Sequence, residues 1–210
     1  LDRARCELAK YYPTYADLEP LDGKNAKPYK KQPMRIVSLN DDGTPDTDKL
    51  NTKFSKDYLK DNHNPRWVAK STLAYLWART VECKNCRAII PLLKTRWLCK
   101  KKDGKKRILL AVEPNDEKTG IVFRIVANVP AKGGNAAQRR EHDKRISLGT
   151  LTQSGARCVC CNSIMTLEDI QVLAQGQEWN SLLFAVVTDG QSGKEYRLPT
   201  HFENEVANGI

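Results

Sequence analysis

Two short cysteine motifs constrain the fold of this chain more than any other feature. Cys83 and Cys86 enclose two residues, and Cys158 and Cys161 enclose two others. Cysteines at this spacing can bind one metal ion from a single tight turn. Two such turns facing each other supply four thiolates and leave no open position, which is the geometry of a structural zinc site and not of a catalytic one. We therefore predict one structural Zn²⁺ bound by these four residues.

The separation of the two motifs is large for a simple zinc ribbon. Between Cys86 and Cys158 lie 71 residues, against about 15–20 in ordinary four-cysteine ribbons. The intervening sequence has the pattern of several strands, which could return the chain to its start. We expect Cys160 to point away from the metal and Cys99 to be a small apolar filler, although either could compete as a ligand. Two metal-free pairs of reduced cysteines are the alternative.

The cysteine content also bears on where the protein works. Seven cysteines without a recognisable secretory signal indicate a reducing compartment, and we expect a cytoplasmic protein. No apolar run approaches the ~18 residues of a membrane span, so we expect no membrane partner. The sequence begins with Leu1 and not with Met, and we interpret it as a fragment of a longer polypeptide.

The pattern of the remaining chain predicts a mostly β (α+β) fold, in which zinc-ribbon or rubredoxin-like knuckles are elaborated by β-hairpins and short helices. Strands are expected around the first knuckle and, on both sides of Asp103-Gly104, as a hairpin. Helices are expected over residues 1–12 and 166–177. Residues 131–145 are predicted to be a basic loop. The expected domains are a terminal helix and polar connection (1–65), a zinc-ribbon domain (66–200) and a loose tail (201–210).

Positive charge gathers in the predicted hairpin. The chain has 35 Lys and Arg against 25 Asp and Glu, a net charge of +10, which favours a polyanionic partner, most often nucleic acid. Between Lys94 and Arg107 the only acidic residue is Asp103. Trp97 could stack on a base. We predict DNA contacts from Lys94, Arg96, Trp97, Lys100, Lys101, Lys102, Lys105, Lys106 and Arg107. The alternative is a solvated edge hairpin whose lysines prevent strand pairing.

Other polar and aromatic residues have ordinary interpretations. A second basic patch, Arg139, Arg140, Lys144 and Arg145, could extend the DNA-binding face. Core positions are expected for Trp67, Trp77 and Trp179. Exposed, nonfunctional side chains are expected for His63, His142 and His201, which lack ligand spacing.

Several segments resemble a known family. The run AYLWARTVECKNCRAIIPLLKTRWLCKKKDGKK looks like the zinc-ribbon segment of adenine-specific DNA methylases that contain a Zn ribbon. The later AVVTDGQSGKEYRLPT and the opening helix ending in YYP resemble the same family. The resemblance covers roughly residues 66–200. This sequence departs from the family at Cys99, where the family usually has Ser, and in the crowded second knuckle with Cys160.

The resemblance implies a parent enzyme that transfers a methyl group from S-adenosylmethionine to the N6 amino group of adenine in DNA. Such enzymes use a Gly-rich cofactor motif and an Asp-Pro-Pro-Tyr-type motif that holds the flipped base. Neither motif occurs here; the nearest is Asn64-Pro65-Arg66-Trp67. By analogy, the chain would be the insertion between these motifs, where some amino-methyltransferases carry target recognition. Its partners would be DNA and the remainder of the methylase polypeptide.

Two other functions compete with this interpretation. A zinc-stabilised module could brace an enzyme or bind a partner protein, with the positive charge serving only solubility. A self-sufficient enzyme is disfavoured, because the sequence shows no paired catalytic carboxylates, no Ser-His-Asp set and no phosphate-binding loop.

Overall fold

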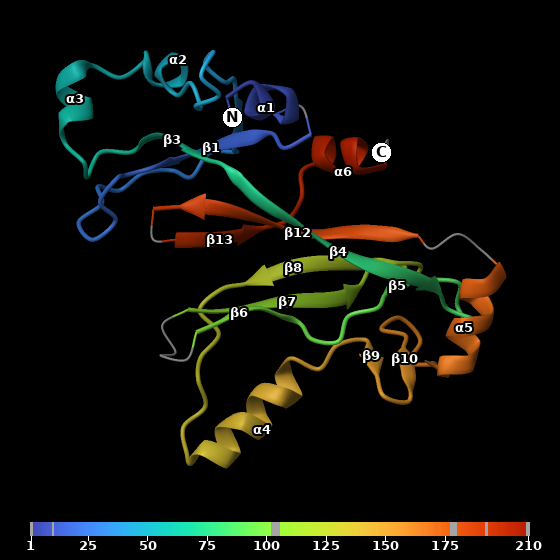
Figure 1. Cartoon of the computed structure of the whole chain (residues 1–210). Helices are drawn as coiled ribbons and strands as arrows, with labels where there is room; N and C mark the ends of the chain where they lie inside the picture. The colour runs from blue at the N-terminus through green and yellow to red at the C-terminus, as the bar shows by residue number, and fades with distance from the viewer. Residues whose placement is uncertain (1, 10, 102–105, 177–179, 192, 209–210) are drawn as a thin grey trace. The chain divides into compact units, whose positions relative to one another are not determined.

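The computed structural model describes residues 2–9, 11–101, 106–176, 180–191 and 193–208, and it divides into two compact units. The first unit contains residues 1–75 and 186–210, and the second contains residues 76–185. Two long strands, β4 (Thr72–Glu82) and β12 (Ser181–Gly190), have residues in both units (Figure 1). The described chain is mostly β with antiparallel pairing and short helices, which confirms the predicted fold class.

The first unit is built on a small antiparallel sheet. The strand β1 (Thr14–Glu19) lies between β2 (Arg35–Val37) and β3 (Arg66–Lys70). One face buries Ala16, Val37 and Trp67 against neighbouring apolar side chains, so Trp67 is a core residue as expected. The unit also contains α1 (Asp2–Leu8), α2 (Asp48–Asn51), α3 (Lys56–Lys60), β13 (Gly193–Arg197) and α6 (His201–Asn208).

Two expectations for the first unit were wrong. Residues 13–65 are not only a polar connection, because β1 and β2 lie within them and pair with each other from Thr14↔Val37 to Ala16↔Arg35. The expected loose tail contains α6, whose Glu203 is buried and accepts hydrogen bonds from the Arg197 guanidinium and from the Thr200 backbone N–H. Both segments are polar, and tertiary partners supply the stabilisation that their local sequence does not provide.

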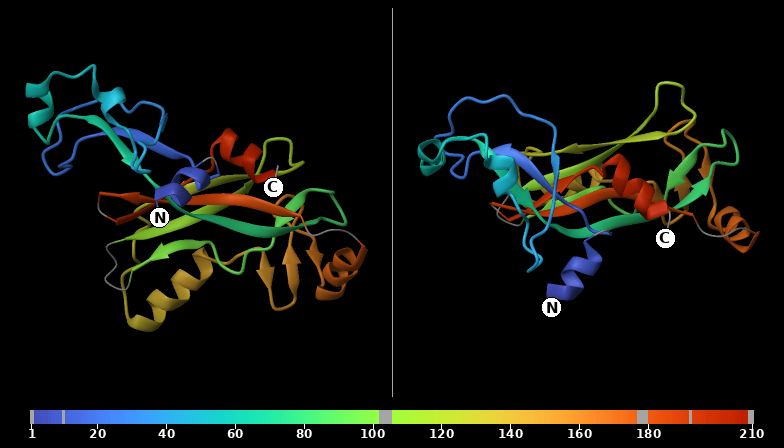
Figure 2. Two further views of the ribbon diagram at one scale, coloured as in Figure 1. Left: turned by 45° about the horizontal axis from the view of Figure 1, so that its top comes forward. Right: turned by 90° about the horizontal axis from the view of Figure 1, so that it is seen from above.

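The second unit contains three strand groups. The strands β6 (Trp97–Lys100), β7 (Arg107–Pro114) and β8 (Ile121–Val126) form one antiparallel sheet, visible from two directions in Figure 2. The strand β5 (Ile89–Pro91) forms a hairpin with β4. The short strands β9 (Leu151–Thr152), β10 (Gly155–Arg157) and β11 (Ile164–Met165) form the third group, which α5 (Leu167–Gly176) contacts.

Helix α4 (Ala136–Ile146) replaces the predicted basic loop at 131–145. Its few apolar residues give no amphipathic pattern, which is why the sequence reads as a loop. The helix starts at a capping box, in which Asn135 Oδ1 accepts from the Gln138 N–H and Gln138 Oε1 accepts from the Asn135 N–H. Among the described residues, no helix of the molecule has the length and apolar character needed to cross a membrane.

Candidate metal centre

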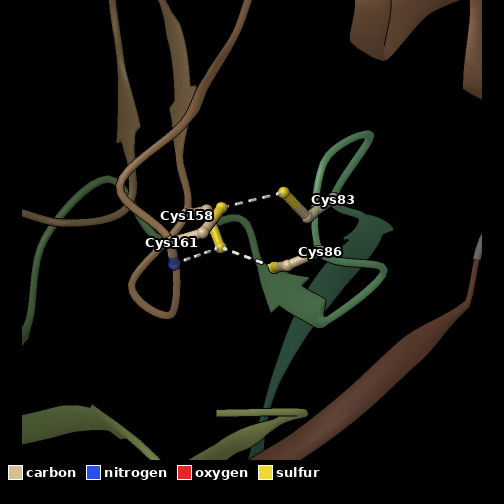
Figure 3. Close-up of side chains that lie close together, drawn as sticks. All are labelled: Cys83, Cys86, Cys158 and Cys161. Carbon is tan, nitrogen blue, oxygen red and sulfur yellow. Dashed lines mark hydrogen bonds between the residues drawn. The ribbon is translucent and has the colours of Figure 1, made fainter.

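The four predicted ligands come together in the second unit. The sulfur of Cys83 lies 3.6 Å from that of Cys161, and the sulfur of Cys86 lies 3.5 Å from that of Cys158 (Figure 3). All four sulfurs lie within 4.8 Å of one another. Tetrahedral zinc with bonds of ~2.3 Å requires sulfurs about 3.8 Å apart, whereas disulfide sulfurs lie about 2.05 Å apart. The spacing therefore fits four thiolates around one ion and does not fit disulfides.

The two knuckles have the same backbone geometry. In each, the N–H of the first cysteine donates to the carbonyl five residues later, Ala88 in one turn and Ser163 in the other, at 2.9 Å. The residue four positions after the first cysteine is left-handed, with φ of 63° at Arg87 and 62° at Asn162. Asn tolerates this conformation better than Arg does. Two turns of matching geometry face each other, as a four-cysteine zinc ribbon requires.

The electrostatics of the cluster also favour a cation. Hydrogen bonds from the Ser163 and Asn85 side chains lower the pKa of the Cys161 thiol to about 5. The Ala88 backbone lowers the pKa of Cys86, but burial and the neighbouring cysteines outweigh it and raise that pKa to about 12. Four thiolates this close repel one another, so full deprotonation needs a positive ion among them. A divalent cation supplies that charge and releases the protons.

The cluster is continuous with the core of the unit. Cys83 and Cys158 are fully buried and pack with the apolar side chains Val81, Ile90, Ala156, Met165 and Ile170. Helix α5 is held to the first knuckle by an ion pair of 2.7 Å between Lys84 and Asp169. Thr166 caps this helix, because its hydroxyl accepts from the Asp169 N–H. A metal ion at this position would join the knuckles and the core into one unit.

The other cysteines lie outside the ligand set. The Cys160 thiol donates to the Gly120 carbonyl at 3.2 Å, so Cys160 points away from the ligand set as expected. Cys99 lies on β6, paired with Ile108, and Cys6 lies on the surface of α1 in the first unit. Of the described residues, only the four predicted cysteines form a group able to hold a metal ion.

The two strands of the predicted hairpin pair as β6 and β7, whereas its turn at Asp103-Gly104 lies outside the described residues; Arg107 does not point to solvent. Arg107 is 5 % exposed, and its guanidinium donates to both carboxylate oxygens of Asp143 and to the Val129 carbonyl. Lys100 forms an ion pair of 2.7 Å with the same carboxylate. The Trp97 ring packs against the Arg107 guanidinium at 4.9 Å. Arg107 is therefore a structural residue, and the prediction that it contacts DNA was wrong. Its burial depends on the tertiary structure and cannot be read from the sequence.

The remaining hairpin candidates differ in their surroundings. Lys94 and Lys101 are exposed, whereas Arg96 is half-buried and donates to the Ile146 carbonyl at 2.7 Å. Lys106 is half-buried immediately before β7. Lys102 and Lys105 lie outside the described residues, as does Trp179. Trp77, expected in the core, is 44 % exposed, because it lies on the outer face of β4, where alternate side chains point away from the core.

Other candidate residues have structural roles. Asn64 is buried and donates to the Tyr58 carbonyl, and Trp67 lies in the core, so the Asn-Pro-Arg-Trp segment is used in packing. His63 is half-buried and hydrogen-bonds Asp61 at 2.8 Å, and His142 is also half-buried, whereas His201 is exposed as expected. A comparison with protein-family models, curated proteins and solved structures finds no match.

Proposed function

We propose that this chain is a zinc-stabilised DNA-binding module that supplies target recognition to an S-adenosylmethionine-dependent adenine-N6 DNA methyltransferase. The observation that carries the proposal is the closed set of four sulfurs in the unit that also holds the cationic strands and helix α4. A closed thiolate site has no position for substrate, so its ion serves folding and not chemistry. The module's function must then come from its surface.

The surface of the second unit favours a polyanion. Exposed cations include Lys94 and Lys101 on the hairpin side and Lys144 and Arg145 on α4. Phosphate contacts of this kind give affinity that does not depend on sequence and falls steeply with salt. The assignment to the methylase family rests on the sequence resemblance over residues 66–200, which supports the choice of DNA as the polyanion. The cofactor and the catalytic motif would come from the remainder of the polypeptide.

Binding of a fluorescent DNA duplex to the zinc-loaded chain tests the DNA-binding step. We expect the logarithm of the binding constant to fall linearly with the logarithm of salt concentration, with a slope of about −0.9 for each phosphate contacted. Loss of binding after zinc removal is also expected, because the site holds the fold together. A chain that is zinc-loaded and folded but does not bind duplex DNA at low salt would contradict the proposal.

Target recognition has its own test, because it requires discrimination between sequences. Selection from a random duplex library with the zinc-loaded chain should enrich a defined site containing adenine. Uniform recovery of all sequences would leave DNA binding in place and remove target recognition. The two results therefore separate a recognition module from one that merely holds DNA.

A protein-interaction module is the second candidate, and exposed apolar side chains beside the knuckles favour it. Ile89 follows the first knuckle, Ile164 follows the second, and Leu167 and Val172 lie on α5; all four are largely exposed. Exposed apolar side chains that form a contiguous patch are typical of protein-interaction surfaces. This candidate predicts that Ile164→Ser with Val172→Ser abolishes association with the parent polypeptide and leaves DNA affinity unchanged.

A further inference from the structure

A second cationic surface lies on the second unit, around Leu148. This leucine is 52 % exposed and lines three neighbouring hollows with volumes of about 470, 340 and 880 Å³. Among the described residues, Glu141 is the only acidic one that lines them. The cations that line them are Lys94, Arg96, Lys132, Lys144, Arg145 and Arg157. We call this region the Leu148 surface.

Backbone pairing builds this surface from distant parts of the chain. The Leu151 N–H donates to the Leu93 carbonyl at 3.0 Å, and the Arg96 N–H donates to the Ser147 carbonyl at 3.0 Å. Thr95 and Leu148 form an isolated antiparallel bridge between these bonds. Residues 93–96 therefore run beside residues 147–151. As a result, Lys94 lines the same hollow as Lys144 of α4, although the two are fifty positions apart in the sequence.

Helix α4 presents Lys144, Arg145 and one acidic residue, Glu141, to this surface, and it turns Asp143 to the interior. Asp143 is buried against Arg107 and Lys100. Lys144 and Arg145, one and two residues later, are exposed, and neither they nor Lys94 forms an ion pair with any described acidic residue. Hollows lined by one sign of charge concentrate the field and attract counter-ions. Asp143 of α4 thus pairs with Arg107 and Lys100 of the hairpin strands, whereas Lys144 and Arg145 of the helix are left for a ligand.

The second knuckle contributes to the same surface. Arg157, immediately before the ligand Cys158, lines one hollow together with Asn162, and its guanidinium donates to the side-chain carbonyl of Asn162 at 3.1 Å. Both residues lie within or beside the turn that the metal would hold. Thr152, Gln153 and Ser154 line another hollow with polar groups that suit phosphate oxygens. Metal binding would therefore set the position of part of the surface.

We infer that DNA binds to the Leu148 surface through its phosphate backbone, and that the tip of the 97–107 hairpin is not the principal contact. This inference rests on the proposed function and names the surface that performs it. Internal pairing occupies two of the cations expected to bind DNA from the hairpin, since Arg107 and Lys100 both bind Asp143. The Leu148 surface keeps five of its six cations exposed, Arg96 being half-buried. It joins three segments and surrounds an apolar side chain that can pack on sugar or base.

Three variants of equal charge test the inference in the zinc-loaded full chain. The first removes cations of the Leu148 surface (K94Q/K144Q/R145Q), the second removes those of the hairpin tip (K101Q/K102Q/K105Q), and the third is a control in the first unit (K24Q/K30Q/K53Q). The control lysines are exposed and form no ion pair with any described residue. Zinc content and thermal midpoint are measured for each variant, so that folding defects are recognised.

We expect the Leu148-surface variant to bind duplex DNA at least about tenfold more weakly, with a salt slope smaller by about 0.9 for each phosphate that the variant no longer neutralises. The hairpin and control variants should stay close to the unmodified chain. Unchanged affinity and slope in the first variant, with weaker binding in the hairpin variant, would overturn the inference and leave DNA binding intact. Absence of DNA binding by the unmodified chain would overturn both.

Discussion

The sulfur of Cys86 lies 3.5 Å from the sulfur of Cys158, although 71 residues lie between them. The intervening chain forms the β6–β7–β8 sheet and helix α4 before it returns. A metal ion that joins the two knuckles therefore closes a long loop, and closing a long loop removes much conformational freedom from the unfolded chain. The metal would stabilise a whole unit and not only two turns.

Removal of single ligands should unfold the second unit. We expect Cys83→Ser and Cys158→Ser each to abolish stoichiometric zinc binding, because apparent binding energies of about 10–16 kcal/mol in small zinc domains are also folding energies. Native mass spectrometry gives the metal content, and near-UV circular dichroism gives the packing. Cys160→Ser is the matched control and should keep one zinc per chain. Full zinc content in Cys83→Ser would refute the assignment.

The buried pair of Asp143 and Arg107 should make stability depend on pH. The Arg107 guanidinium, with help from Lys100 and against burial, holds the pKa of the Asp143 carboxyl well below its usual range. A lowered folded-state pKa adds stability that is present above about pH 4 and is lost as the pH falls further. Asp143→Asn should cost about 3 kcal/mol at pH 7, because it leaves a buried, unpaired guanidinium.

This prediction is checked by urea unfolding of the unmodified chain and of Asp143→Asn, from pH 7 towards pH 3, with zinc in excess. The difference in unfolding free energy between them should shrink below about pH 4, because Asp143 takes up a proton in the unfolded chain there while it stays ionised in the folded chain. A difference that stays constant over this range would mean that the carboxylate charge does not contribute.

Gly149 should be required for the backbone pairing between residues 93–96 and residues 147–151 in the Leu148 surface. A Cβ at this position would lie 1.8 Å from the Leu93 carbonyl oxygen, which is backbone and cannot turn away. Gly149→Ala should destabilise the unit by about 2 kcal/mol or more and weaken DNA binding. Gly133→Ala is the control, since a Cβ at Gly133 would have nothing within 4 Å. Equal thermal midpoints for the two variants would contradict the close approach.

Lys70 should be a key residue of the first unit. Its ammonium group is largely buried and lies 3.0 Å from Asp17, 2.8 Å from Glu19 and 2.7 Å from Glu195. Lys70→Met would leave three carboxylates close together without a cation, at a cost of about 3–5 kcal/mol. Chemical denaturation measures this change, and the exposed Lys53→Met should change stability by no more than about 0.5 kcal/mol.

A pH series separates charge from packing at Lys70. In Lys70→Met the crowded carboxylates hold protons more tightly in the folded state than in the unfolded state. The loss of unfolding free energy caused by the substitution should therefore decrease as the pH falls from 7 to 5. If the loss of unfolding free energy did not change with pH, Lys70 would stabilise the unit through packing of its aliphatic stem and not through its charge.

Features encoded within a few neighbouring residues could be predicted from the sequence. The Cys-x-x-Cys spacing identified the four sulfurs, and the helix expected over residues 166–177 is α5. The Asp103-Gly104 hairpin signal predicted the two strands that the structure has as β6 and β7. Helix α4 was missed because its start depends on the Asn135 cap and its packing on one inward acidic residue, Asp143. Neither feature gives an apolar period.

The sequence by itself determined which sulfurs could hold a metal, because two cysteines in one turn can chelate an ion whatever surrounds them. Only the tertiary structure decided which positive charges are left for a partner. Arg107 and Lys94 look alike in the sequence, yet one is buried against Asp143 and the other lines an open hollow beside Lys144. Charge is a property of the residue, but its availability depends on the neighbours that folding brings to it.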